Sequence, residues 1–217
     1  MEKLHPYLAI FAITAAFTAL GIYGSEETGS LLLLAGALHL LGDGLPFVAD
    51  LCNEFFVRQK RLSWLIKLCI LLGNSLFLLG TTTYIAWEAY DRWQSPFVIG
   101  KWVLLFAVLE IIGNTLQARY AHRLKHLRAH DEGGHVHESQ MGHLIGDIAA
   151  STVQGLGALG IFLTGALWID PAASAFGALL TFILALKGLR DFFKLWTRGE
   201  DDEISETHEH AHGHDHH

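Results

Sequence analysis

Apolar residues of the chain fall into six long runs, each separated from the next by a short polar stretch. The runs cover approximately residues 6–23, 31–55, 64–87, 97–120, 140–168 and 170–196. About 20 consecutive apolar residues span the hydrocarbon core of a bilayer as a helix, whereas helices of soluble proteins carry a single apolar stripe. The pattern therefore predicts an all-α membrane protein with six transmembrane helices in residues 1–196.

Residues 197–217 have a different composition. They contain seven acidic residues against one arginine, and six of the last ten residues are histidine. A segment with so few apolar side chains buries too little surface to offset the entropy of ordering. We therefore expect an acidic, His-rich tail without fixed structure.

Lys and Arg residues are concentrated at one side of the predicted membrane. They cluster after the second run, after the fourth run and at the C-terminal exit, whereas the first and fifth connections are acidic or neutral and the third is mixed. Connections rich in Lys and Arg stay in the cytoplasm. This rule predicts that both termini are cytoplasmic.

Two matched His-x-x-x-Asp pairs lie inside or beside apolar runs. The first is His39 and Asp43, and the second is His143 and Asp147. Side chains four residues apart share one face of a helix. An ionised Asp at the centre of a membrane helix costs about 2.5 to 3.5 kcal/mol on insertion scales, so such residues usually mark a functional site. The two pairs predict a four-ligand N2O2 metal site between the second and fifth helices, which suits Zn²⁺.

Further polar residues extend this candidate site. Asp50 and Glu54 project within about 60° of the first pair on a helical wheel, and they indicate either a wetted path to the site or residues at headgroup level. Glu110, inside the fourth run, is a candidate proton carrier, a part of the metal path or a structural hydrogen-bonding group. The accessory candidates are thus Asp50, Glu54 and Glu110.

The segment after the fourth run is rich in histidine. It contains His126 and His130 in a basic stretch predicted to be helical, and His135 and His137 beyond a Gly pair. Imidazole is a common metal ligand near neutral pH. We interpret this segment as a weak, exchangeable metal-collecting loop, with a merely solvated loop as the alternative.

Other classes of protein are disfavoured. No basic face indicates nucleic-acid binding, and Cys52 and Cys69 form no C-x-x-C motif. An intramembrane zinc-dependent hydrolase remains an alternative, but two complete pairs leave no open position for an activated water. A haem protein with His39 and His143 as axial ligands leaves the two Asp residues without a role. We expect no organic cofactor.

Motifs along almost the whole chain resemble the cation diffusion facilitator family of zinc transporters. They are Ser30, Ala35 and Ala37 before His39 and Asp43; Trp87-Glu88-Ala89; Gly113-Asn114; His143 to Asp147; and Trp168 to Ser174 with Asp170-Pro171. The resemblance implies that His39, Asp43, His143 and Asp147 form the transport site. It also implies a homodimer that exports Zn²⁺ from the cytosol in exchange for protons.

The ligand chemistry is consistent with this implication. Both ligand types lose protons when they bind metal, so binding is linked to proton release. Thiolate ligands are absent, which disfavours copper(I), while Cd²⁺, Co²⁺ and Ni²⁺ remain alternative cargoes. The compact chain favours the bacterial inner membrane, with an organelle membrane as the alternative.

The chain differs from most members of the family after the sixth run. Most continue into a cytoplasmic ferredoxin-like domain, whereas only the acidic tail follows here. It resembles the members that lack this domain, and we expect a dimer held by the membrane helices.

Overall fold

The computed structural model describes residues 4–56, 60–95, 99–129 and 152–212. These residues form helices α1 Leu4–Thr28, α2 Leu31–Phe56, α3 Lys60–Gln94, α4 Val103–Ala129 and α6 Ile169–His212, together with the shorter helix Thr152–Thr164. The first five are long and apolar enough to cross a membrane. The prediction of an all-α membrane protein is confirmed.

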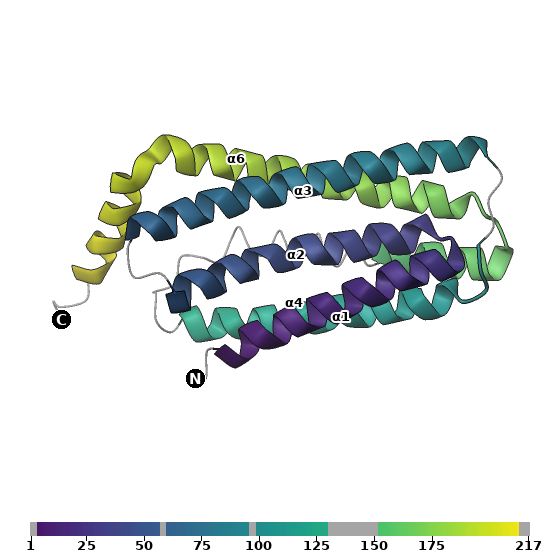
Figure 1. The fold of residues 1–217 in the computed structure, drawn as a ribbon, viewed down its shortest axis with the longest axis horizontal. Helices are drawn as coiled ribbons and strands as arrows, with labels where there is room; N and C mark the ends of the chain where they lie inside the picture. Colours follow the sequence, from purple (N-terminus) through teal and green to yellow (C-terminus); the bar gives the residue numbers. More distant parts are fainter. Residues whose placement is uncertain (1–3, 57–59, 96–98, 130–151, 213–217) are drawn as a thin grey trace.

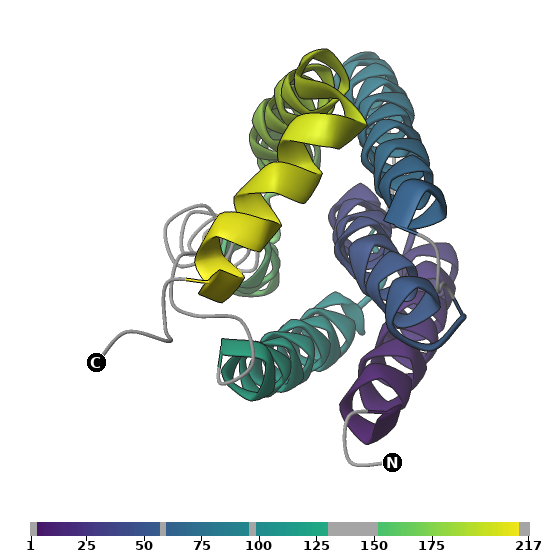
Figure 2. The same ribbon diagram turned by 90° about the vertical axis from the view of Figure 1, so that its left-hand side faces the viewer.

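The helices lie roughly side by side, and α2 occupies the centre of the bundle. It contacts α1, α3, α4 and α6. Figure 2 shows α2 between the α3–α6 pair and the α1–α4 pair. In Figure 1, α1 begins and α6 ends at one end of the bundle, whereas the α1–α2 turn, the end of α3 and the beginnings of α4 and α6 lie at the other. We call this second end the turn end.

Exposed aromatic side chains gather at the turn end. Trp87, Tyr90 and Trp93 lie at the end of α3, and Trp102 and Trp168 lie just before α4 and α6; all five are more than half exposed. Trp and Tyr concentrate where membrane meets water, because their rings are apolar and their edges polar. Exposed Phe and Leu side chains cover the outer surfaces of the helices between the two ends. This arrangement suits a bundle surrounded by lipid.

Glycines set the close approach of α1 and α4. A Cβ atom added to Gly113 would lie 2.5 Å from Cγ of Phe17, and one added to Gly24 would lie 2.5 Å from Cγ of Phe106. Each ring thus packs directly on the backbone of the facing helix. Small residues commonly have this role between membrane helices.

The first connection is shorter than predicted. Residues 24–28, expected to belong to a loop, continue α1 to Thr28, and only Gly29 and Ser30 separate it from α2. Gly29 has a φ of 70°, which glycine adopts without strain. The Thr28 hydroxyl donates to the carbonyl of Gly24, and the Ser25 hydroxyl donates to that of Ser30. These polar side chains therefore complete a tight turn.

Several helix ends also differ from the predicted ones. Lys60 and Arg61, expected in a connection, begin α3, and α4 begins later and ends later than the fourth apolar run. Helix α6 continues to His212, into the segment expected to lack fixed structure. Hydropathy marks where a helix meets water rather than where it ends, and Lys, Arg and Glu are themselves good helix formers. Hydropathy therefore underestimates the length of a helix that extends beyond the apolar core of the membrane.

Candidate metal site

His39 and Asp43 form a buried pair on α2. His39 is 5% exposed and Asp43 12% exposed, and Nε2 of His39 lies 3.4 Å from Oδ2 of Asp43. The four-residue spacing places both side chains on one helical face, as the sequence predicts.

Thr181 of α6 approaches the other nitrogen of the imidazole. Its Oγ1 lies 3.4 Å from Nδ1 of His39 and donates to the carbonyl of Gly177. Since the hydroxyl proton is used in that bond, the oxygen is left to accept from Nδ1–H. We therefore assign the imidazole proton to Nδ1, which leaves the lone pair of Nε2 directed at Asp43.

A pocket adjoins His39 where four helices meet. Its polar lining comes from His39 on α2, Thr81 and Thr82 on α3, Thr181 on α6 and Gln154 on the helix Thr152–Thr164. Leu, Ile, Ala and Gly side chains complete the wall. His39 is thus buried against protein yet borders a small pocket inside the bundle.

Glu110 of α4 lies deeper in the bundle, at 2% exposure. A Cβ added to Gly21 of α1 would lie 2.6 Å from its Oε1, and one added to Gly36 of α2 would lie 2.7 Å from its Oε2. The Gln154 amide nitrogen packs against the same face of Gly36. Glu110 therefore occupies a niche between α1, α2 and the helix Thr152–Thr164.

The remaining predicted ligands are only partly covered by the structure. Asp50 and Glu54 belong to α2, and His126 belongs to α4, but their side chains are not described. The other five lie outside the described residues: His130, His135, His137, His143 and Asp147. Within the described part of the chain, no three His, Cys, Asp or Glu side chains form a complete metal site. The pairing of His39 and Asp43 with His143 and Asp147 therefore stays a prediction.

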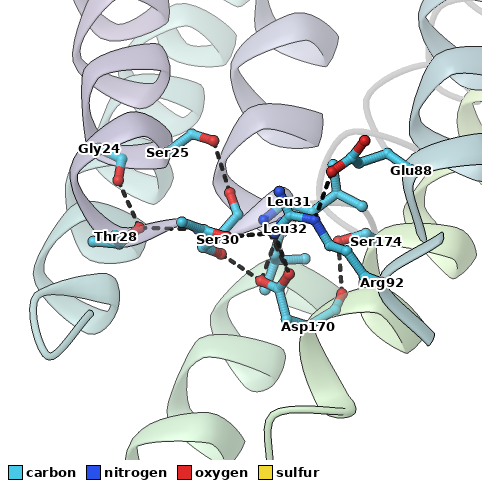
Figure 3. Close-up of polar contacts among 11 residues, drawn as sticks. Gly24, Ser25, Thr28, Ser30, Leu31, Leu32, Glu88, Arg92, Asp170 and Ser174 are labelled. Carbon is cyan, nitrogen blue, oxygen red and sulfur yellow. Dashed lines mark hydrogen bonds and ion pairs between the residues drawn. The ribbon is translucent and has the colours of Figure 1, made fainter. Parts of the chain in front are cut away.

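Asp170 caps a helix other than its own. An Asp directly before Pro171 is typical of a residue that caps the helix it begins, but the carboxylate of Asp170 caps α2 instead (Figure 3). It accepts hydrogen bonds from the Ser30 hydroxyl at 2.5 Å and from the backbone N–H groups of Leu31 at 2.9 Å and Leu32 at 3.3 Å. A negative charge at a helix N-terminus satisfies N–H groups that have no partner within the helix.

Arg92 of α3 joins the same cluster. Its guanidinium donates to the Gly29 carbonyl and to Glu88 at 2.9 Å, and it lies 3.6 Å from the Asp170 carboxylate (Figure 3). Asp170 is fully buried. This cluster, which we call the turn-end cluster (Ser30, Glu88, Arg92 and Asp170), connects the ends of α2, α3 and α6. A distant pairing of this kind has no local signature in the sequence.

Taken together, the fold and the buried His–Asp pair define a helical membrane protein with a candidate cation site inside the bundle. The profile of the cation efflux transmembrane domain matches residues 7–195. The chain belongs to the cation efflux family.

Bacterial proteins resemble this chain over most of its length. The zinc transporter ZitB of Escherichia coli (strain K12) is 30% identical over 192 residues, which cover 85% of this chain and 59% of that protein. ZitB of Pectobacterium atrosepticum is 30% identical over 205 residues, covering 91% and 62% respectively. The metal cation efflux system protein CzcD of Cupriavidus metallidurans is 28% identical over 168 residues, covering 74% and 51%.

The chain spans about three-fifths of the length of the ZitB proteins that it matches. By their names, the ZitB relatives transport zinc and the CzcD relative belongs to a metal cation efflux system.

Proposed function

We propose that the protein exports a divalent metal cation, Zn²⁺ first of all, from the cytosol in exchange for protons. The observation that carries the proposal is the arrangement of His39 and Asp43. With the imidazole proton on Nδ1, a lone pair of Nε2 and a carboxylate oxygen face each other at 3.4 Å. Two acceptors at this distance repel unless a cation or a proton lies between them.

The second pair, His143 and Asp147, supplies the other two ligands in this proposal. Two imidazoles and two carboxylates form a closed tetrahedral site for Zn²⁺. The names of the ZitB relatives support zinc as cargo, and that of CzcD supports a broader set of metal cations. Cd²⁺, Co²⁺ and Ni²⁺ are therefore secondary cargoes to test.

Proton exchange follows from the chemistry of these ligands. Imidazolium has no lone pair for a metal, and a protonated carboxyl is a poor ligand, so Zn²⁺ and protons compete for one site. The unperturbed pKa of His is about 6.5, which makes this competition effective near neutrality. Acid on the outer side displaces the ion, and the less acidic cytosol permits reloading.

The membrane placement in this proposal follows the charges. Most Lys and Arg residues, Lys60, Arg61, Arg119 and Arg123 among them, lie near the end of the bundle opposite the turn end, whereas Arg92 and Lys101 lie at the turn end. The Lys/Arg-rich end therefore faces the cytoplasm with both termini. A bacterial inner membrane fits the bacterial relatives. We further propose a homodimer formed through the membrane helices of the 1–196 transport domain, with residues 197–217 as a cytoplasmic segment.

The test is Zn²⁺ flux into proteoliposomes that carry a pH gradient. The parent should move Zn²⁺ faster than Mn²⁺, and the flux should collapse when the gradient is dissipated. Asp43→Ala and Asp147→Ala should each abolish it, whereas Asp191→Ala, a change at an exposed part of α6, should leave it unchanged. Parental flux in Asp43→Ala would show that this pair is not the transport site.

A further inference from the structure

Glu110 is a buried carboxyl that the four-ligand site does not use. Neither of its oxygens forms a hydrogen bond of good geometry among the described residues, and the backbone of Ala37 is the polar group beside it. The niche exists because Gly21 and Gly36 lack side chains, so two helices leave room for this carboxyl. A glutamate with this degree of burial in a membrane bundle is costly without a function.

The surroundings of Glu110 contain no compensating charge in the part of the chain that the structure describes. Helix α1 presents Gly21, α2 presents Gly36 and Ala37, and the helix Thr152–Thr164 presents Gln154. Thr18, also nearby on α1, directs its hydroxyl to the carbonyl of Ala37. An isolated carboxylate is strongly disfavoured in such a site, so the carboxyl is neutral while no cation is close.

Gln154 connects this niche to the pocket beside His39. Its amide nitrogen lies at the Gly36 face, where Oε2 of Glu110 also lies, and its side chain lines the pocket. Gly36 precedes His39 by about one helical turn, roughly 4.5 Å of rise. Glu110 therefore lies on the turn-end side of His39, near the candidate metal site but not in contact with it.

We propose that Glu110 is a proton-binding site coupled to cation binding at His39 and Asp43, with Gln154 as the polar link between niche and pocket. This inference rests on the proposed function and adds a residue to it. A divalent cation at the His39–Asp43 pair brings positive charge close to the carboxyl and favours its ionised form. Loading the cation releases the Glu110 proton, and releasing the cation lets the carboxyl take up a proton again.

The coupling is reciprocal, as linkage requires. Protonation of Glu110 weakens cation binding by the same factor by which the cation weakens proton binding. Glu110 lies toward the turn end, which the proposed topology directs away from the cytosol, so it is closer than His39 to the side from which protons enter. Glu110 thus carries one of the exchanged protons, in addition to those of the metal ligands.

The experiment counts the protons released when Zn²⁺ binds to the full chain in weakly buffered detergent, with a pH-indicator dye. Glu110→Gln should bind Zn²⁺ and release about one proton fewer per ion than the parent. Glu110→Asp keeps a carboxyl and should restore the release. Glu27→Gln, which changes an exposed carboxyl of α1, should release the parental number.

Infrared difference spectroscopy gives a second readout that does not depend on transport. Zn²⁺ should remove the C=O stretch of a protonated carboxyl in the parent, and this band should shift its frequency in Glu110→Asp. The same band should be missing from the difference spectrum of Glu110→Gln, where only bands of the ligand carboxyls can remain. If Glu110→Gln does not fold, the parent and Glu110→Asp spectra still decide the question. Absence of that band change in the parent would overturn the inference.

The two proposals fail in different ways. A parent that neither binds nor transports Zn²⁺ contradicts the proposed function itself. A parent that transports Zn²⁺, with Glu110→Gln releasing as many protons, contradicts only the role of Glu110.

Discussion

The hydroxyl of Ser30 donates a 2.5 Å hydrogen bond to the carboxylate of Asp170, which lies 140 positions later in the chain. The bond joins the N-terminus of α2 to the first turn of α6. It belongs to a set of three in which one buried carboxylate satisfies a side chain and two backbone N–H groups.

Asp170→Asn should destabilise the protein by roughly 1 to 3 kcal/mol, because hydrogen bonds to a charged acceptor are the stronger ones and a buried amide cannot accept at both terminal atoms. Thermal unfolding in detergent, followed by tryptophan fluorescence, measures the change. Asp91→Asn, at an exposed position of α3 beside Arg92, is the matched control and should have little effect. Equal stability of the two variants would contradict the capping role.

Arg92 and Asp170 should be energetically coupled. Arg92→Lys retains the charge but loses the planar set of donors that reaches Gly29 and Glu88 together. A double-mutant cycle of Arg92→Lys and Asp170→Asn, measured by the same unfolding assay, should give a coupling energy of about 0.5 kcal/mol or more. Strict additivity would mean that the guanidinium of Arg92 contributes nothing to Asp170 beyond the positive charge that Lys retains.

Thr181→Val should weaken Zn²⁺ binding about 10-fold or more, because the variant removes the oxygen that fixes the proton on Nδ1 of His39. Isothermal titration calorimetry of the purified protein measures the affinity. Thr197→Val, on an exposed surface of the same helix, should bind Zn²⁺ as the parent does. If both variants bind alike, the imidazole is oriented by some other group.

Gly36→Ala should disturb both Glu110 and Gln154, since the new Cβ would overlap the Gln154 amide nitrogen and lie 2.7 Å from the Glu110 carboxylate. Overpacking of this kind costs about 1 to 3 kcal/mol. Unfolding temperature and Zn²⁺ flux should therefore both decrease. Gly80→Ala, where a Cβ meets nothing within 4 Å, should be neutral or slightly stabilising because Ala favours a helix. If Gly36→Ala had the unfolding temperature and the Zn²⁺ flux of the parent, the niche around Glu110 would have room for the added methyl group.

Hydropathy was sufficient to predict the membrane class and the central part of each helix, because about 20 apolar residues have few alternatives. It was insufficient for Lys60 and for residues up to His212, where charged residues continue a helix in water. The spacing of His39 and Asp43 correctly predicted one shared face, since that relation is local.

Relations between distant residues were harder to predict. Asp170-Pro171 resembles a helix start, so a local rule assigns the carboxylate to α6, but the carboxylate accepts from backbone N–H groups of α2. Thr181 has no pattern that separates it from other threonines in apolar helices, and only its position opposite His39 identifies it. Glu110 was singled out by its charge, but the glycine niche around it depends on packing of helices far apart in sequence.

The two-residue connection between α1 and α2 has a mechanical consequence. Gly29 and Ser30 are too short a connection to let the adjoining ends of α1 and α2 separate. The carboxylate of Asp170, on α6, also hydrogen-bonds the first turn of α2. Helix α2 is therefore fixed at Leu31, and any tilt of the helix takes place about this residue. While these bonds hold, a tilt moves Leu31 least, His39 slightly more and Phe56 most, so rearrangement of the bundle is largest at the end far from the pinned turn.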